Sequence, residues 1–216
     1  MAVYSGPEIV NNGLVFVADV GNIKSYSGSG DTWKDIQQDV TSTGTSVPSF
    51  FNNPDWSSNV THLTVTSVVS VLGYDTGYAY HPISKWVGTT DATFVLYHFQ
   101  NFQSNNSQNR FMWYGNRGGV WSSLSNSYTG SPGNTYMFTL QYNSTTGGQG
   151  WVNNNKISGR VGSGVLGTST ASIRIDGGPL ARSGIHNTLA AWIYDRELTD
   201  QEIQQNFEAT RSRYGI

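Results

Sequence analysis

Hydrophobic and polar residues alternate along two long stretches of the chain, a pattern typical of β-strands with one buried face. In residues 62–72 the inward set is Leu63, Val65, Val69 and Val71. In residues 135–143 it is Tyr136, Phe138, Leu140 and Tyr142. We therefore predict a half-buried strand over residues 62–72 and a second strand over residues 135–143.

Shorter apolar runs predict further strands. Residues 14–19 follow the turn pair Asn12-Gly13 and read as a buried strand, whereas residues 94–99 are apolar on both faces and predict a central strand. Residues 109–114 and 119–123 flank a predicted hairpin turn at 115–118, and 151–152 and 156–157 flank three asparagines, which tolerate the conformations of a tight hairpin. Residues 173–175 and 189–194 complete the set.

Two segments lack a strand pattern. Glycine and small polar residues make 21–30 a loop. Residues 36–59 are polar and contain Pro48 and Pro54, which would interrupt a hydrogen-bonded ladder. We expect this second segment to be irregular and to cover a sheet edge.

The C-terminal segment has helical spacing. Thr199 and Glu202 form a capping-box pattern, an apolar stripe follows, and Gly215 stands at the position of a C-terminal cap. The stripe consists of Ile203, Phe207, Thr210 and Tyr214. These features predict one helix over about residues 200–213, packed on a β-sandwich.

The composition agrees with an all-β chain. Its 216 residues include 25 Gly, 26 Ser, 21 Thr and 19 Asn, and only 12% are charged. This length suits one large all-β domain. We assign residues 13–216 to a single domain that includes the helix, and residues 1–12 to an N-terminal arm.

Charge and cysteine content exclude several classes of function. Twelve Lys and Arg residues are scattered along the chain and the net charge is −2, so we expect no nucleic-acid partner. No run of about 18 apolar residues exists, and no signal peptide is visible, so we expect no membrane insertion. The absence of cysteine fits synthesis in a cytoplasm.

Both ends and one middle segment resemble a known family. The segments are LVFVADVGNIKSYSGSGDTWKD (14–35), LQYNSTTGGQGWVN (140–153) and AWIYDRELTDQEIQQNFEATRSRYGI (191–216). They are similar to laminin G-like, concanavalin A-like domains of tailed-phage virion proteins, whose openings read much like L-x-L-D-A-x-N-x-x-S-Y-x-G-S-G-x-x-W-x-D. Asn154 replaces the glycine of that family's usual N-G turn.

The resemblance implies a fold and a context. It implies an all-β, concanavalin A-like (laminin G-like) jelly-roll β-sandwich with one C-terminal α-helix, in which Trp33 and Trp192 are packing residues. It also implies a virion protein made in the host cytoplasm. Its partners would be other virion proteins, such as a capsid or tail component, and we expect a homo-oligomer.

Glycan hydrolysis is a possible activity to test, because concanavalin A-like folds include glucanases. Retaining hydrolysis needs two carboxyl groups about 5–5.5 Å apart. The four glutamates are Glu8, Glu197, Glu202 and Glu208, one in the leading segment and three around the helix. No strand carries a carboxylate pair at alternating spacing, so we predict that the chain is not an enzyme.

Histidines and serines do not change that prediction. His62, His81, His98 and His186 show no H-E-x-x-H or H-x-H arrangement and are interpreted as surface or sheet-face residues. No G-x-S-x-G elbow supports a serine nucleophile.

Calcium and sugar are the two ligands that remain. Laminin G-like domains often hold calcium, and the weak candidates here are Asp19, Asn22, Asp31 and Asp35; the simpler interpretation is that they shape their loop. No other cofactor is expected. The candidate sugar-stacking residues are Trp86, in a glycine-containing turn region, and Trp113, Tyr114 and Trp121 around the predicted hairpin. Aromatic residues in a sandwich also serve as core or interface anchors.

Two classes of function therefore compete. The first is a non-enzymatic structural virion protein, either a capsid decoration protein or a fibre or appendage component. The second is a carbohydrate-binding module that recognises host surface glycans. A glycan hydrolase is a remote third hypothesis.

Overall fold

Two antiparallel sheets packed face to face form the protein. The computed structural model describes residues 8–27, 32–42, 49–51, 60–73, 81–88, 91–100, 109–157, 159–175 and 186–216. The first sheet has six strands in the order β1-β15-β5-β11-β12-β13. Their bounds are β1 Leu14–Asp19, β15 His186–Tyr194, β5 His62–Val71, β11 Thr135–Asn143, β12 Gly147–Val152 and β13 Asn155–Lys156.

The second sheet has seven strands, and a small ribbon lies apart. Six of the seven follow the order β10-β8-β7-β6-β14-β4, and β9 pairs with β8. Their bounds are β10 Tyr128–Gly130, β8 Asn109–Arg117, β7 Asp91–Gln100, β6 Ile83–Gly88, β14 Ile173–Ile175, β4 Ser49–Phe51 and β9 Val120–Ser123. The ribbon pairs β2 (Lys34–Asp35) with β3 (Val40–Thr41).

The core lies between the two sheets and uses the predicted inward residues. All eight alternating side chains of the two long stretches belong to it: Leu63, Val65, Val69 and Val71 of β5, and Tyr136, Phe138, Leu140 and Tyr142 of β11. The seven-stranded sheet contributes Phe94, Leu96, Phe111 and Trp113 from its central strands. The predicted β-sandwich is confirmed.

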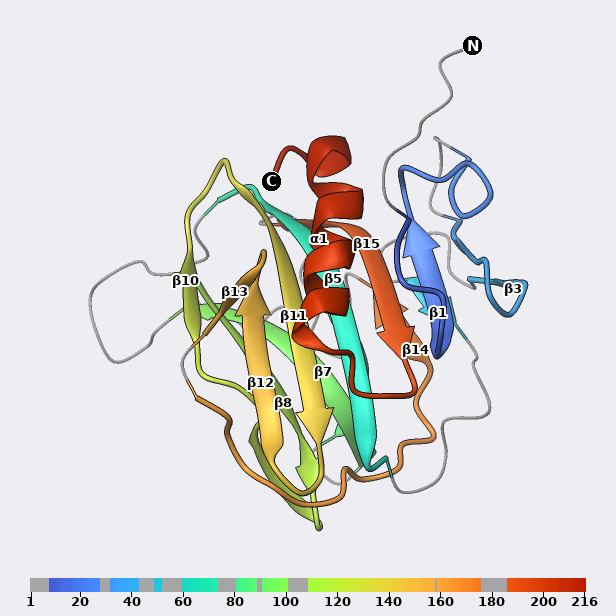
Figure 1. The fold of residues 1–216 in the computed structure, drawn as a ribbon. Coiled ribbons are helices and arrows are strands. Elements are labelled where there is room, and N and C mark those ends of the chain that lie inside the picture. The colour runs from blue at the N-terminus through green and yellow to red at the C-terminus, as the bar shows by residue number, and fades with distance from the viewer. Residues whose placement is uncertain are drawn as a thin grey trace.

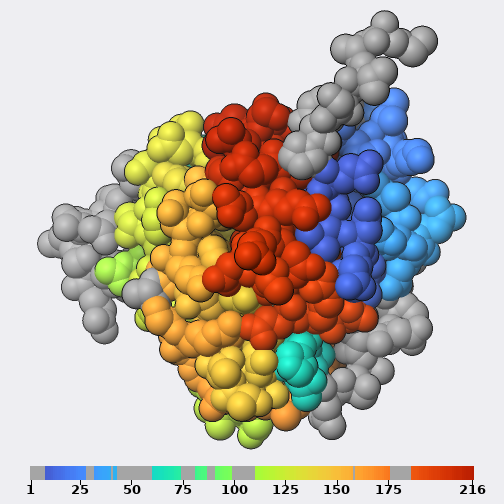
Figure 2. Space-filling model, in the orientation of Figure 1, coloured from blue at the N-terminus to red at the C-terminus, as the bar shows by residue number. Residues whose placement is uncertain are grey.

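A helix covers the outer face of the six-stranded sheet. Helix α1 spans Asp200–Tyr214, and the predicted capping box of Thr199 and Glu202 and the left-handed cap at Gly215 are both present. In Figure 1 the helix lies in front of this sheet and the seven-stranded sheet lies behind it. Figure 2 shows α1 running across this face of the molecule, between the N-terminal strand and the β11–β13 region.

The helix creates a second apolar cluster. Ile203 and Phe207 of α1 pack with Val68, Met137 and Trp192 of the sheet. As a result β5 is buried on both faces: on its outer side Thr66 is 1% exposed and Val68 is 0% exposed. The prediction that β5 is half-buried was wrong, because the helix replaces the solvent on that side.

The remaining differences concern short or irregular strands. Residues 36–59 were expected to be irregular, yet they contain β3 and β4, and β4 is the edge strand beside β14. Strands β6 and β10 were not predicted, and Trp86 lies in β6 rather than in a turn.

Residues 8–12 of the predicted arm contact the helix. The backbone N–H of Val10 donates to Asn206 Oδ1 at 2.8 Å, and Gln205 Nε2 donates to the carbonyl of Glu8. Residues 1–7 lie outside the described residues. Among the described residues, no helix is long and apolar enough to span a membrane.

Candidate functional site

Aromatic side chains gather on the outer face of the seven-stranded sheet. Leu96 and Trp113 point into the core, so their neighbours Tyr97 and Tyr114 point to the opposite face. Trp121 of β9 pairs with Asn116, two residues beyond Tyr114, and shares that face. With Trp86 and His81, these three residues form what we call the aromatic cluster.

The rings of the cluster are in mutual contact. Trp121 stacks on Tyr114 with centroids 5.8 Å apart and planes 17° apart, and on Trp86 at 6.0 Å and 29°. Tyr97 meets Tyr114 edge to face at 5.2 Å. His81 closes the group, 4.9 Å from Trp86 and 4.5 Å from Tyr97. Such offset and edge-to-face pairs stabilise a cluster beyond its area burial.

The cluster has a buried floor and an accessible side. His81 is 2% exposed and Trp86 is 7% exposed, whereas Tyr97, Tyr114 and Trp121 are half-buried. Within the described part of the chain, Trp86 Nε1 and both ring nitrogens of His81 have no hydrogen-bond partner. Burying such groups unpaired costs about 1–3 kcal/mol each. The chain therefore tolerates a local cost in stability beneath these rings.

Burial also sets the charge state of the cluster. It lowers the pKa of His81 to about 3, and the electrostatic interactions with His186 and Arg174 act in the same direction. Burial, assisted by Tyr114, raises the pKa of Tyr97 to about 12. His81 and Tyr97 are therefore both neutral at pH 7, and the cluster presents an uncharged surface.

A tight hairpin holds Trp121 in place. The chain turns between β8 and β9 at Gly118 and Gly119, which both have positive φ, and the N–H of Gly119 donates to Asn116 Oδ1 at 2.9 Å. Val120 at the tip is 65% exposed. The predicted hairpin is present, and it brings Trp121 back alongside Tyr114.

The structure unites three of the four predicted sugar-stacking residues. Trp86, Tyr114 and Trp121 come from three strands and meet in the cluster. Trp113 does not join them, because it is 1% exposed and packs against Phe94 between the sheets. Sequence reasoning missed His81 and Tyr97. The apolar run that contains Tyr97 predicted a strand there. It did not indicate which side of the sheet the Tyr97 ring faces.

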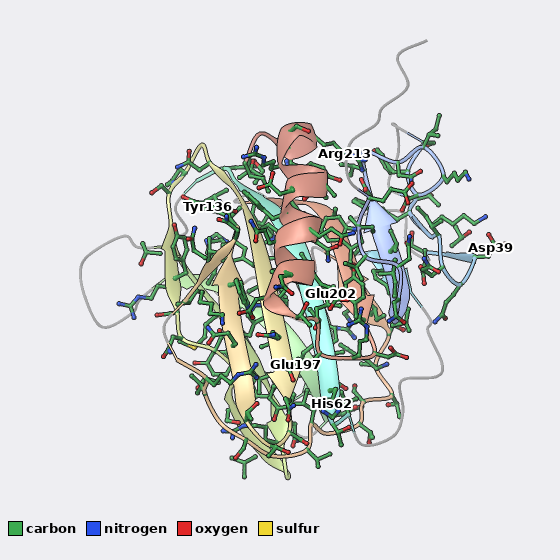
Figure 3. All side chains as sticks on the ribbon, in the orientation of Figure 1. Asp39, His62, Tyr136, Glu197, Glu202 and Arg213 are labelled. Atoms are coloured by element: carbon green, nitrogen blue, oxygen red, sulfur yellow. The ribbon has the colours of Figure 1, made fainter. Side chains whose placement is uncertain are left out.

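The loop after β1 uses its acidic residues for folding. The carboxylate of Asp19 accepts hydrogen bonds from Arg213 Nη1 and Gly21 N, both at 2.7 Å, and from the Tyr214 hydroxyl. Figure 3 shows Arg213 near the C-terminal end of α1. This candidate calcium ligand is therefore paired with a cation of the helix.

Two other calcium candidates are used in the same way. Asp35 Oδ1 accepts from the backbone N–H of Val17 and of Gln37, both at 3.0 Å, and burial raises the pKa of this carboxyl. Asn22 Oδ1 accepts from a backbone N–H of its own loop. Asp31 lies outside the described residues. Among the described side chains, no group of three or more His, Asp or Glu could hold a metal ion.

The glutamates near the helix are bound to cations. Glu197 pairs with Arg160, and it accepts from Asn143 Nδ2 at 2.8 Å. Glu202 pairs with Arg196 at 2.6 Å. Glu208 pairs with Arg211 at 2.8 Å. Each has a structural role at the start or on the surface of α1.

Two histidines meet inside the sandwich. His98 of β7 stacks on Phe111 at 4.1 Å, and its Nδ1 lies 3.3 Å from His186 Nδ1 of β15. His98 is 0% exposed and His186 is 8% exposed. These two residues lie on facing strands of the two sheets, so of the two alternatives, surface or sheet face, the structure places them on sheet faces.

Comparison with known proteins shows the fold. Neither a family model nor a curated protein sequence matches this chain. Among solved structures, a sialidase of Trypanosoma rangeli matches with a TM-score of 0.59 and 15% identity, over 97% of this chain and 36% of that one. The binding domain of botulinum neurotoxin serotype D matches with a TM-score of 0.60 and 11% identity, over 91% of this chain and 50% of that one.

A mutant of a protein designated HCR/D matches with the higher TM-score of 0.66, at 10% identity, over 93% of this chain and 52% of that one. The chain thus spans about a third to a half of the structures it matches. They include an enzyme and a binding domain, so they do not separate catalysis from binding. What they establish is that the chain has a β-sandwich fold.

Proposed function

We propose that the chain is a non-enzymatic structural component of a tailed-phage virion, built on a lectin-like sandwich. The observation that carries this proposal is that the two ends resembling phage domains fold into one unit. Strand β1 pairs with β15 over its length, and Arg213 of α1 binds Asp19 at the end of β1. A resemblance confined to unrelated segments would not require this pairing.

The carboxylates support a role without catalysis. Glu197 and Glu202 lie around the start of α1, and each is bound to an arginine. The hydrogen bonds from Arg196 lower the pKa of Glu202 to about 2, so this carboxylate cannot serve as the general acid of a hydrolase at neutral pH. The remaining carboxylates described above shape loops or pair on the helix surface.

The surface chemistry supports assembly with other virion proteins. Only 12% of the residues are charged, so repeated protein contacts desolvate few ions. Polar hydroxyl and amide groups pair across interfaces, and aromatic side chains anchor them. We propose a homo-oligomer, or a protein bound to a larger shell or appendage, that is made in the host cytoplasm and works on the particle.

Mass spectrometry of gradient-purified particles tests this function. The expected result is that peptides of this chain co-sediment with the virion proteins at a fixed ratio across the particle peak. A high-salt wash of the particles is the control for loose adsorption. If the chain is abundant in the lysate but missing from washed particles, the proposal fails.

A second function, carbohydrate binding, is favoured by one specific observation. Tyr114 and Trp121 form a near-parallel, half-buried pair on the outer face of a lectin-like sheet. A structural neighbour has been solved in complex with sialic acid. A virion component that recognises host glycans would combine both functions, since the cluster and the paired ends lie on opposite sheets.

A further inference from the structure

The register of the β8–β9 hairpin determines which backbone groups of β9 bond to β8. Leu124, which directly follows β9, donates its N–H to the carbonyl of Trp113 at 2.7 Å. Hydrogen-bonded and non-bonded residues alternate along an antiparallel pair. Counting back from Leu124 through the register, Ser122 and Val120 are therefore also bonded to β8.

The alternate residues of β9, Trp121 and Ser123, turn their backbone groups to the outer edge of the sheet. Their two N–H and two C=O groups face away from β8, which is the only described strand that pairs with β9. Within the described part of the chain, none of these four groups has a hydrogen-bond partner. Such a row of unpaired groups is a template for another strand.

The two edges of the six-stranded sheet are protected, and the edge at β9 is not. Strand β1 is covered by the segment of the β2–β3 ribbon, since the N–H of Ile36 donates to the carbonyl of Val17 at 3.1 Å. The opposite edge, β13, has two residues and carries Lys156, which pairs with Asp200 at 2.7 Å. Strand β9 reads Val-Trp-Ser-Ser and contains neither a charge nor a proline, the residues that commonly keep a strand from adding to an edge.

The outward groups of β9 are complementary to those of a second copy of the same strand. When two copies run antiparallel with Ser122 facing Ser122 across a two-fold axis, Trp121 of each chain faces Ser123 of the other. Each of these residues both donates and accepts, so four hydrogen bonds use all the outward groups of the two strands. A register shifted by two residues leaves half of these groups unpaired.

The side chains beside this edge suit a contact between copies. Val120 is 65% exposed at one end of the strand, and a second copy would cover part of it. Ser122 and Ser123 are small and uncharged, so no like charges of β9 meet at the axis. Arg117, on the same face as Ser122, is held within its own chain by Ser122 Oγ and by the carbonyl of Ser163, both at 2.8 Å.

Resting on the homo-oligomer proposed above, we propose that β9 is an interface for a second copy of this chain, formed by antiparallel β9–β9 pairing about a two-fold axis at Ser122. The pairing joins the two seven-stranded sheets into one continuous sheet. A four-residue strand buries little area, so the association of chains in solution is weak, and repeated contacts on a particle strengthen it.

Single cysteines test this pairing, because the chain contains none. Across the axis the two Cα atoms at position 122 lie about 4.5 Å apart, within the range of a disulfide, whereas those at position 120 lie about 14 Å apart. We expect Ser122→Cys to form covalent dimers about tenfold faster than Val120→Cys under mild oxidation. Random collisions would favour Val120→Cys, because Val120 is the more exposed residue.

A proline at the edge provides the matched variant. Ser123→Pro, made in the Ser122→Cys chain, removes an outward N–H and leaves the bonds between β9 and β8 in place. We expect it to slow dimer formation about tenfold, to the rate of random collision. Ser123→Thr is the control, because it keeps the N–H and a side chain suited to a strand, and it should leave the rate unchanged.

Amide hydrogen exchange of the parent chain tests the pairing without any substitution. The N–H groups of Trp121 and Ser123 should exchange more slowly in concentrated protein than in dilute protein. Those of Val120 and Ser122 should not change, because they already bond to β8. This measurement decides the matter if melting curves show that a variant is not folded.

Each result decides the proposal. Faster crosslinking at position 122 than at position 120, slowed by Ser123→Pro and kept by Ser123→Thr, supports it. Crosslinking of Val120→Cys at an equal or higher rate overturns it, as does crosslinking of Ser122→Cys that the proline does not slow. With unfolded variants, exchange that is independent of concentration at Trp121 and Ser123 overturns it. None of these failures removes the chain from the virion, which the particle analysis tests separately.

Discussion

Arg196 holds Glu202 through two parallel bonds, Nη1 to Oε2 at 2.9 Å and Nη2 to Oε1 at 2.6 Å. The same carboxylate accepts the backbone N–H of Thr199 at 2.8 Å and so forms half of the capping box. Arg196 lies two residues after the end of β15, and its Nε donates to the carbonyl of Asn12. One ion pair thus fastens the start of α1 to the sheet and to the chain ahead of β1.

Replacing Glu202 should loosen this junction. Glu202→Gln removes the charge-assisted pair and weakens the cap, and we expect a loss of about 1–2 kcal/mol in the free energy of unfolding. Glu208→Gln is the matched control, because its pair with Arg211 lies on the exposed helix surface and contributes within about 0.5 kcal/mol. Equal urea midpoints for the two variants would contradict the anchoring role.

The same pair predicts acid sensitivity. Its hydrogen bonds to Arg196, together with the cap, lower the pKa of Glu202 from 4.5 to about 2. The stabilisation is therefore complete above pH 4.5 and declines as the pH falls toward 2. Glu202→Gln should show a smaller loss of stability over this range than the parent chain. Parallel acid-unfolding curves would contradict the assignment.

Deleting residues 199–216 should damage the whole sandwich. The helix covers Val68, Met137 and Trp192, and removing Phe207 alone from this cluster should cost about 3–5 kcal/mol. We expect insoluble protein or a clearly lower melting temperature. An unchanged melting curve would show that α1 is a tether and not part of the domain.

His81 predicts a second pH effect, in a milder range. Its pKa falls from 6.5 in the unfolded chain to about 3 in the fold, so the unfolded state binds the proton first. Stability should decrease as the pH drops below 6.5, by about 2 kcal/mol at pH 5 from this residue. His81→Phe should flatten the dependence between pH 7 and 5, whereas the exposed His62→Gln should not. Identical slopes for both variants would contradict this account.

The chain should not hydrolyse glycans. Its helix-proximal glutamates are held by Arg160 and Arg196, and no strand in the described part of the chain presents a carboxylate pair. Incubation with β-glucans, galactans and a fluorogenic sialoside should release neither reducing ends nor fluorophore above a boiled control. Sustained turnover that scales with protein concentration would contradict the non-enzymatic function.

The sequence predicts long regular elements better than the surface they form. Alternation located β5 and β11, and the capping box located α1, because these signals are local. Thr64 Oγ1 donates to the carbonyl of Arg196 and accepts from the N–H of Leu198, which are 132 and 134 residues away in sequence, and no local pattern records such contacts. Strand β6 was missed because its apolar residues, Ile83 and Trp86, do not alternate cleanly across its β-bulges.

The candidate site was also predicted only in part, because its assembly depends on tertiary contacts that no local pattern records. Trp113 and Tyr114 are adjacent in a strand, so they must face opposite sides of the sheet, but only the tertiary fold shows which side is the core. Tyr97 and His81 join the cluster through pairing between β6, β7 and β8, which the sequence does not specify.

A reconstruction of the intact particle tests the central claim most directly. The account predicts a repeated density that fits this sandwich, with paired sheets and a single helix, bound to a capsid or tail protein. The outer face of the seven-stranded sheet, with Tyr114 and Trp121, should point away from that contact. A fully occupied map of infectious particles in which no density fits the sandwich would contradict the virion function.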